Sequence, residues 1–417
     1  MTIFSVKRSV NIEKRTLLRT IYLFNKFKLF KFRKKLGRKK ARFNVSALSS
    51  MQDINRIYLN DADNLLTAEL LKLDGFDYHA NGGNLGDFLI AQSEYKLFEE
   101  LKLKYRIYKR ADKTPLQANL VIGGGGGFVS YWNYQALFPL LNDKNVKNIL
   151  ILPSSFFNCD DFVNIIDNRF TIFCREKHSY DYLIKKNTGA KIYMAHDMAT
   201  LLTIDNLAQN LLAVNADKIV SEQSFVDNVY KQMFIYYRLI YDNLRKSLKK
   251  IKANKNGLKV GYFLRNDKEC LLNWKQYNIN STVDISTCAY GTCEDESMTN
   301  ILTKMFLSAI EKVDVVVTDR LHVGVAGLLL NKKVYWGDNS YKKITGVYDF
   351  SYKNNPDAKI IMPENLQKEL KNLVVAKTAN DTEFNKMDLS FNDFCLAYCK
   401  NYKKQPVANI ITGIEYD

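Results

Sequence analysis

The stretch Val315-Val316-Val317-Thr318-Asp319-Arg320-Leu321-His322 decides the fold class of this chain. Its β-branched residues predict a buried parallel strand, and the apolar run 323–330 predicts a helix directly after it. In an open α/β sheet, ligands bind beyond the carboxyl ends of the strands, where helix N-termini present free N–H groups. Arg320 offers a planar fork of donors and His322 can exchange a proton near neutral pH, so we expect an anion site here. The alternative is that Asp319 and Arg320 pair on the surface while His322 caps a helix.

Length and composition indicate a folded protein of more than one domain. A chain of 417 residues exceeds one ordinary core, and 47% hydrophobic with 25% charged residues excludes wholesale disorder. No stretch approaches the roughly 20 apolar residues that span a bilayer, and the first residues lack the order of a signal peptide. The odd number of cysteines, seven, then indicates reduced thiols in a cytoplasm. Their spacing lacks that of a zinc knuckle, so we expect no metal.

The net charge of +17 is concentrated at the N-terminus. Residues 1–42 hold 15 Lys and Arg against the single acid Glu13, whereas the other 375 residues hold 46 bases and 43 acids. Phe, Leu and Tyr alternate with these cations, which suits the interface of an anionic membrane. We expect the tail to hold the protein peripherally on the inner face of the cytoplasmic membrane. A nucleic acid is the less favoured partner, and a solvated leader is the third interpretation.

After the tail, strand patterns alternate with amphipathic helix patterns, which is typical of a parallel sheet with helices on both faces. We therefore predict an α/β fold with two Rossmann-like domains facing across a cleft. The expected parts are a basic amphipathic tail (1–45), an N-terminal domain (46–255) with a long helical segment (205–253), a C-terminal domain (256–375), and a segment (376–417) that crosses back to the first domain. The expected strands are 77–80, 105–108, 119–122, 146–153, 170–175, 191–195, 258–264, 283–285, 314–318 and 333–336, with helices at 178–186 and 297–311.

Two glycine-containing loops follow predicted strands. Five consecutive glycines, 123–127, are costly in conformational entropy and indicate a close approach of the backbone to a ligand. Their spacing fits neither the dinucleotide fingerprint nor the P-loop, so a nucleotide cofactor is not supported. The loop 82–87 precedes a helix whose N-terminus favours an anion, although a plain loop explains it nearly as well.

Arginines stand at the ends of three predicted strands, at Arg175, Arg265 and Arg320. Each could pair with a neighbouring acid on the surface, but three equivalent positions favour a shared anion-binding cleft. His196 and Asp197 end another strand, where a helix cap and a catalytic role are equally good interpretations. The loop 338–343 adds polar donors at a further strand end.

Seven of these segments resemble, in order, the motifs of the polysaccharide pyruvyl transferase family. They are 83–87, 123–126, 175–181, 196–199, 265–267, 318–322 and 338–343, all within about residues 75–350. The resemblance implies a GT-B-like fold and transfer of a pyruvyl group from phosphoenolpyruvate to a sugar of a cell-surface glycan or its lipid-linked precursor. The product would be a pyruvate ketal, with release of phosphate and without a cofactor beyond the donor.

The family's motifs carry residue roles onto this chain. The donor-binding arginine corresponds to Arg175, and the Arg-Leu-His element to Arg320, Leu321 and His322. Phosphoenolpyruvate carries a phosphate close to a carboxylate, which explains a need for several cations. We hypothesise that the two arginines hold the donor and that His322 is the general acid, with Asp87 or Asp197 as the base. Further donor contacts are expected from Arg265, Asn339, Lys343, Gly124 and Gly125, and acceptor contacts from Asn84, Asp87 and His196.

Two other functions remain open at this stage. The first is a nucleotide-sugar glycosyltransferase of the same architecture. The second is a non-catalytic adaptor that binds a membrane or a nucleic acid through its basic tail.

Overall fold

The computed structural model describes residues 61–109, 114–202, 257–271 and 283–373, together with residues 240, 244, 248, 249, 251, 253, 274 and 279. All of them belong to one compact unit, Asn55–Asp417. The basic tail 1–45, most of the helical segment 205–253 and the C-terminal segment 376–417 lie outside the described residues, so the predictions for them stay predictions.

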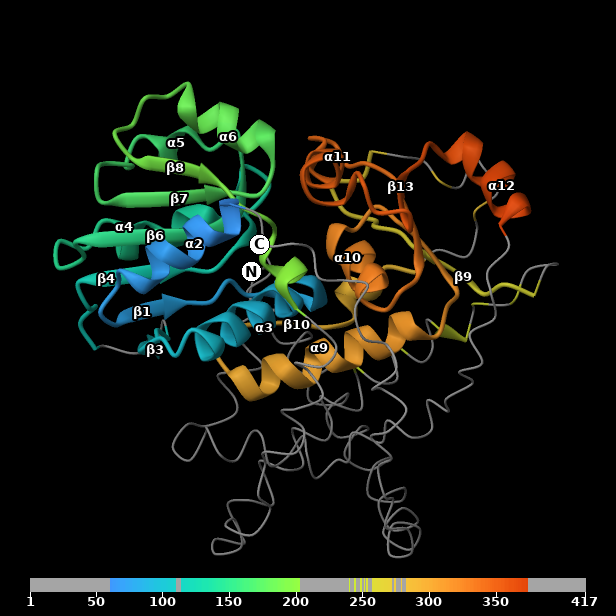
Figure 1. Cartoon of the computed structure of the whole chain (residues 1–417), viewed down its shortest axis with the longest axis horizontal. Helices are drawn as coiled ribbons and strands as arrows, with labels where there is room; N and C mark the ends of the chain where they lie inside the picture. Colours follow the sequence, from blue (N-terminus) through green and yellow to red (C-terminus); the bar gives the residue numbers. More distant parts are fainter. Residues whose placement is uncertain are drawn as a thin grey trace, which may run out of the picture. The chain divides into compact units, whose positions relative to one another are not determined.

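The larger sheet has seven strands in the order β3-β1-β4-β6-β7-β8, with β5 also paired to β6 (Figure 1). Every pair in it is parallel. Its strands are β1 (Phe76–His79), β3 (Tyr105–Ile107), β4 (Asn119–Ile122), β5 (Gly125–Val129), β6 (Asn148–Phe157), β7 (Phe170–Cys174) and β8 (Lys191–Met194).

Helices cover both faces of this sheet. Successive side chains of a strand point to opposite faces, and each face carries apolar side chains that the helices bury. In β4, Val121 joins one buried cluster while Leu120 and Ile122 join another. The first cluster includes residues of α2 (Asp61–Leu71) and α3 (Leu85–Glu100). The second includes residues of η2 (Tyr134–Leu137), α4 (Phe138–Leu141), α5 (Asp160–Val163) and α6 (Lys177–Ile184).

The smaller sheet has four parallel strands in the order β13-β12-β11-β9. Val316 faces one cluster and Val315 and Val317 face the other, so this sheet too is covered on both faces. Its strands are β9 (Val260–Phe263), β11 (Val315–Thr318), β12 (Lys333–Trp336) and β13 (Ala358–Ile360). The helices around it are α9 (Glu296–Glu311), α10 (Leu321–Leu329), α11 (Lys343–Val347), the π-helix η7 (Tyr348–Tyr352) and α12 (Pro363–Asn372).

The two sheets share one hydrophobic core through their helices. Helix α3 lies side by side with α9 and also packs against α10 and the 3-10 helix η3 (Met198–Leu201) (Figure 1). Phe88 of α3 and Phe306 of α9 belong to the same buried cluster. A two-residue antiparallel ladder between β2 (Gly83–Asn84) and β10 (Tyr290–Gly291) adds a backbone connection.

The α/β class and the large parallel sheet are confirmed. The finer prediction, two Rossmann-like domains facing across a cleft in a GT-B-like arrangement, stays a prediction. Two local predictions were wrong. The segment 283–285 is no strand: Val283 N–H donates to Tyr262 at 3.0 Å, but Asp284 turns toward Arg320 and the chain enters the 3-10 helix η6 (Ile285–Cys288). The glycine run is not only a loop, since its second part forms β5.

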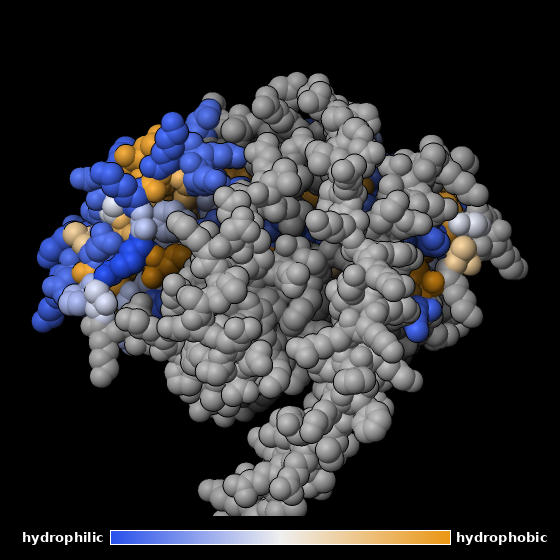
Figure 2. Space-filling model, turned by 90° about the horizontal axis from the view of Figure 1, so that it is seen from below, coloured by the Kyte–Doolittle hydropathy of each residue, from blue (hydrophilic) through white to orange (hydrophobic). Residues whose placement is uncertain are grey.

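The described surface is mixed in polarity. Figure 2 shows hydrophilic side chains over much of the coloured part of one face, with smaller hydrophobic groups among them. Within the residues that the structure describes, no helix combines the length and the apolar character that crossing a bilayer requires. The exposed large hydrophobic residues among them are Leu71, Trp132, Ile184, Leu271, Tyr290 and Met362.

Candidate functional site

A cavity of about 290 Å³ lies where strands of both sheets end. Its lining residues follow β1, β4 and β7 of the larger sheet and β9 and β11 of the smaller one. Parallel strands bring their carboxyl ends to one edge, which explains why side chains from distant segments meet here. The predicted site residues that line the cavity are Asn84, Asp87, Gly124, Arg175, Arg265, Arg320, Leu321, His322 and Lys343.

Four predicted residues do not line the cavity. Asp197 lies behind it and contacts two residues that do. Asn339 is buried and holds the cavity wall, since its amide donates to Glu269 at 3.0 Å and its Oδ1 accepts from Lys343 N–H. Gly125 begins β5. His196 is buried elsewhere, with Nδ1 2.8 Å from Ser351 Oγ and its ring against Phe350.

Arg175 is fully buried at the end of β7, with one side of its guanidinium fixed. Its Nε donates to Ser155 Oγ at 2.9 Å, and Nη1 donates to Asp197 Oδ2 at 2.6 Å. Among the residues described, Nη2 has no hydrogen-bond partner, and a Cβ on Gly126 would stand 3.4 Å from it. The same Cβ would stand 3.9 Å from Lys343 Nζ. Two cationic groups therefore converge beside the glycine run.

Asp197 is shared between Arg175 and His322. Its Oδ2, which accepts from Arg175, also lies 3.3 Å from His322 Nε2. Burial alone would raise the pKa of Asp197, but His322 and Arg175 together hold it well below its ordinary value. This carboxylate therefore remains charged at any neutral pH and fixes the orientation of both partners.

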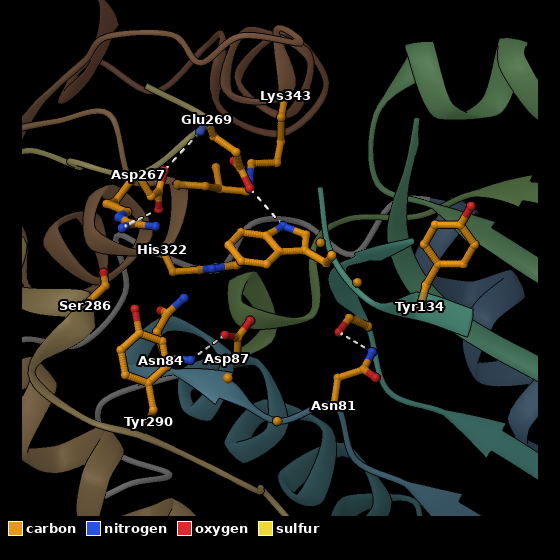
Figure 3. A pocket seen from close by; sticks show the side chains of 18 of the residues that line it. Asn81, Asn84, Asp87, Tyr134, Asp267, Glu269, Ser286, Tyr290, His322 and Lys343 are labelled. Carbon is orange, nitrogen blue, oxygen red and sulfur yellow. Dashed lines mark hydrogen bonds and ion pairs between the residues drawn. The ribbon is translucent and has the colours of Figure 1, made fainter. Parts of the chain in front are cut away.

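Asn84 and Asp87 form a capping box at the start of α3. The Asn84 side chain accepts from Gly86 N–H, and Asp87 Oδ2 accepts from Asn84 N–H at 2.7 Å. Burial raises the pKa of Asp87, against the opposing effects of His322 and of the Asn84 N–H. Figure 3 shows Asn84, Asp87 and His322 close together on one side of the cavity.

Arg320 at the N-terminus of α10 is held by two carboxylates. It pairs with Asp284, and its Nη2 lies 2.7 Å from Asp267 Oδ2. Asp319, in contrast, does not pair on the surface: it is buried and accepts from Arg265 N–H at 2.7 Å and from Trp274 Nε1 at 3.1 Å. The surface-pair interpretation of the segment 315–322 is thereby excluded for Asp319.

Glu269 is a buried carboxylate that connects three other cavity residues. Its Oε2 accepts from Arg265 Nη1 at 2.6 Å and from Lys343 Nζ at 3.0 Å, and its Oε1 accepts from Trp132 Nε1 at 3.0 Å (Figure 3). Burial would raise the pKa of Glu269, but Lys343 and Arg265 hold it well below its ordinary value. Every cation of the cavity thus has a carboxylate partner, and an anion must use the donor hydrogens that these pairs leave over.

The glycine run is shaped by a buried carboxyl group behind it. Glu94 accepts from Gly124 N–H at 2.6 Å and from the Tyr78 hydroxyl. A Cβ on Gly124 would stand 2.7 Å from the Pro153 carbonyl oxygen, so only glycine fits there. Burial raises the pKa of Glu94 to about 7, although both hydrogen bonds oppose the shift.

Sequence reasoning missed Asn81, Trp132, Glu269, Ser286 and Tyr290, all of which line the cavity. Glu269 had a detectable signal, since it stands four residues after Arg265. Asn81 directly follows a predicted strand and could also have been found. Ser286 likewise follows a segment predicted as a strand, 283–285. Trp132 and Tyr290 lie in segments without strand or helix periodicity and gave no such signal. No group of three or more potential metal ligands gathers in the described part of the chain.

Comparison with known proteins identifies the family. Residues 84–341, more than half of the chain, match the model of the polysaccharide pyruvyl transferase family. The chain belongs to the polysaccharide pyruvyl transferase family. Its membership indicates a transferase of polysaccharide biosynthesis with a polysaccharide acceptor. The resemblance found in the sequence motifs is confirmed.

One solved structure supports the fold of this family member. It is an uncharacterised protein from Klebsiella pneumoniae, with a TM-score of 0.54 and 24% sequence identity over 73% of this chain and 100% of that chain. At that identity the likeness concerns the fold alone. No curated protein matches this pyruvyl transferase family member.

Proposed function

We propose that this protein transfers a pyruvyl group from phosphoenolpyruvate to two hydroxyls of a sugar, forming a pyruvate ketal and releasing phosphate. The single observation that carries the proposal is the meeting of Arg175, Arg320, His322 and Lys343 around one cavity in a member of this family. A compact donor with two anionic groups matches several cationic side chains at different strand ends.

The donor is best accommodated beside the glycine run. Arg175 Nη2 and Lys343 Nζ both approach Gly126, and Lys343 keeps ammonium hydrogens beyond the one directed at Glu269. A carboxylate or phosphate placed there would receive charged hydrogen bonds from two directions. Arg320, 7% exposed, also lines the cavity and is a third cationic side chain there. Fixed positive groups of this kind stabilise the negative charge of a departing phosphate.

The proton transfers follow from the placement of His322 and Asp87. In the proposed reaction, the terminal carbon of the donor's alkene gains a proton from His322, and the neighbouring carbon forms bonds to two sugar oxygens as its bond to phosphate breaks. Of the two hydroxyl protons, one replaces the proton that His322 gave to the new methyl group, and the other leaves with phosphate. Asp87 lines the cavity and is our choice of base for a sugar hydroxyl.

Asp197 is better assigned as a positioning residue than as a base. It does not line the cavity, and its Oδ2 is engaged by Arg175 and His322. Its pKa, held well below the ordinary value, makes it a poor proton acceptor. A carboxylate in that place orients the imidazole of His322 through the contact with its Nε2.

We also propose a domain arrangement and a cellular location for this protein. We infer two Rossmann-like domains in a GT-B-like arrangement, with a division near residue 255. We also infer a cytoplasmic location, in which the tail 1–42 binds the inner face of the membrane peripherally and brings the enzyme to a lipid-linked acceptor. The concentration of cations in that tail supports this part of the proposal.

The test is phosphate release from phosphoenolpyruvate against a panel of free and lipid-linked glycans. The proposal expects release that depends on both substrates, and a drop of at least about 100-fold in His322→Ala. Phosphate release by His322→Ala at the wild-type rate would remove this residue from the mechanism. Turnover of nucleoside diphosphate sugars, with no binding of phosphoenolpyruvate, would replace the proposal with a glycosyltransferase.

A further inference from the structure

One cavity residue stands apart from the paired charges. The chain has three tryptophans; Trp336 and Trp274 are 0% and 4% exposed, whereas Trp132 is 42% exposed and lines the cavity. Large apolar rings left in water lose the free energy that burial would contribute, so an exposed ring in a cavity points to a ligand that covers it.

The indole of Trp132 is held in place. Its Nε1 donates to Glu269 Oε1 at 3.0 Å, and that carboxylate is itself fixed by an arginine and a lysine. Lys268 Nζ lies 5.5 Å from the ring centroid, which occupies one face of the indole. Within the described residues, no other ring or cation contacts Trp132. The indole is therefore held at its Nε1 and beside Lys268, and its 42% exposure leaves ring surface for a ligand.

Uncharged polar groups accompany this ring in the cavity. Ser286 is 1% exposed and lines the cavity (Figure 3), yet its hydroxyl makes no hydrogen bond to any residue that the structure describes. Asn133, next to Trp132, has no side-chain hydrogen bond within the same residues either. A buried hydroxyl without a partner costs about 1–3 kcal/mol, so a ligand that bonds it gains correspondingly.

From these observations, and resting on the proposed function above, we propose that Trp132 is the platform on which the acceptor pyranose packs. A pyranose ring presents a patch of C–H groups on its face and hydroxyls around its edge. The C–H patch fits an aromatic face, through apolar burial and weak C–H contacts, while the hydroxyls suit Ser286 and Asn133. Tyr290, also 42% exposed and lining the same cavity, offers a second ring for an adjoining sugar. In this proposal the cationic side chains bind phosphoenolpyruvate, and the uncharged residues around Trp132 bind and select the sugar.

The exposed tryptophan provides the readout. Wild-type protein, Trp132→Phe, Trp132→Ala and the control Met362→Ala are titrated with methyl glycosides of hexoses and N-acetylhexosamines, followed by tryptophan fluorescence and calorimetry. Met362 is 51% exposed and lies outside the cavity lining, so its truncation removes exposed apolar surface without touching the site. Phosphoenolpyruvate binding to each protein is measured in parallel, and circular dichroism checks folding.

The expected result is a glycoside that changes the fluorescence of the wild type and of Met362→Ala. In Trp132→Phe the change should vanish because the two remaining tryptophans are buried, and in Trp132→Ala the affinity should fall at least about tenfold. Phosphoenolpyruvate affinity should stay within about twofold in Met362→Ala. In the Trp132 variants it should fall less than the glycoside affinity does, because Trp132 reaches the donor site only through Glu269, which holds Lys343. Should Trp132→Ala not fold, calorimetry on Trp132→Phe, with an affinity reduced several-fold by loss of the larger ring, decides the matter.

Three outcomes would overturn the subsite: equal glycoside affinity in wild type and the Trp132 variants, no glycoside binding to the wild type even at about 100 mM, or a fluorescence response to nucleoside diphosphates alone. The proposed function fails on a separate observation, namely absence of phosphoenolpyruvate binding to the wild type. Glycoside binding through Trp132 in that case would leave the sugar subsite standing.

Discussion

Gly86 in the first turn of α3 lies directly against His322 in the first turn of α10. A Cβ atom on Gly86 would stand 2.9 Å from the Cβ of His322 and 3.0 Å from its Nδ1. The two helix N-termini can approach this closely because position 86 has no side chain. The position of the imidazole in the cavity therefore depends on a residue that contributes no chemistry.

Gly86→Ala should displace His322 and lower kcat at least about tenfold, since sub-ångström shifts of a proton donor are costly. The control is Gly291→Ala, where the nearest atom to the added Cβ is Phe88 Cζ at an ordinary 3.4 Å. Steady-state phosphate release measures both. Equal kcat in the two variants would show that the close approach has no role in placing the imidazole.

Asp197→Asn should cost about 3 kcal/mol of unfolding free energy, because buried Arg175 would lose its closer carboxylate partner and keep only Glu176, 3.9 Å from its Nε. The folded pKa of Asp197 lies below its ordinary value of 3.8, so its contribution is present above pH ~4 and lost on acidification. Urea unfolding of the wild type from pH 3 to 7 should therefore show a loss at the acidic end that the variant lacks. Asp160→Asn removes an exposed ion pair with Lys186 and should change little.

Glu94 should give the opposite pH dependence. Burial raises its folded pKa to about 7 from an ordinary 4.5, so the native state binds the proton more tightly than the unfolded state does. Stability from this group is complete below pH ~4.5 and declines as the pH rises to about 7, by an amount of the order of 3 kcal/mol. Glu94→Gln should flatten that decline in chemical unfolding between pH 5 and 8. Glu99→Gln, at an exposed carboxylate of the same helix, is the control and should leave the slope as it is.

Arg175→Lys should weaken phosphoenolpyruvate binding by about 10- to 100-fold while preserving the overall charge. A lysine can still reach Asp197, but it lacks the second nitrogen that faces Gly126. Calorimetric titration with phosphoenolpyruvate measures the change. Arg169→Lys, at the start of β7 and outside the cavity lining, should lower stability without changing donor affinity. The same affinity in Arg175→Lys as in the wild type would place the donor elsewhere.

The main lines of the site could be predicted because they follow from the order of strands. Arg175, Arg265 and Arg320 each follow a β-branched or aromatic run, and parallel pairing brings the ends of such runs together at one edge. His322 follows from the same rule, as it stands two residues after Arg320.

The remaining features depend on contacts between distant segments. Trp132 lines the cavity through a bond to Glu269, 137 positions away, and no local pattern encodes that pairing. The segment 283–285 has the composition of a strand, but the ion pair of Asp284 with Arg320 ends its pairing with β9 after one bond. His196 has the right neighbours in sequence, yet packing against Phe350 turns it to another part of the structure. Contacts of this kind depend on tertiary structure, so local sequence patterns could not predict them.

A single oxygen of Asp197, Oδ2, contacts both the guanidinium of Arg175 and the imidazole of His322. An anion that attracts the guanidinium of Arg175 would weaken the ion pair between Arg175 and Asp197. The Asp197 carboxylate would then interact more strongly with His322. If Arg175 and His322 have the roles proposed above, binding of phosphoenolpyruvate would change the contacts of His322 before the sugar binds. The proposed mechanism therefore predicts ordered binding, with phosphoenolpyruvate before the sugar.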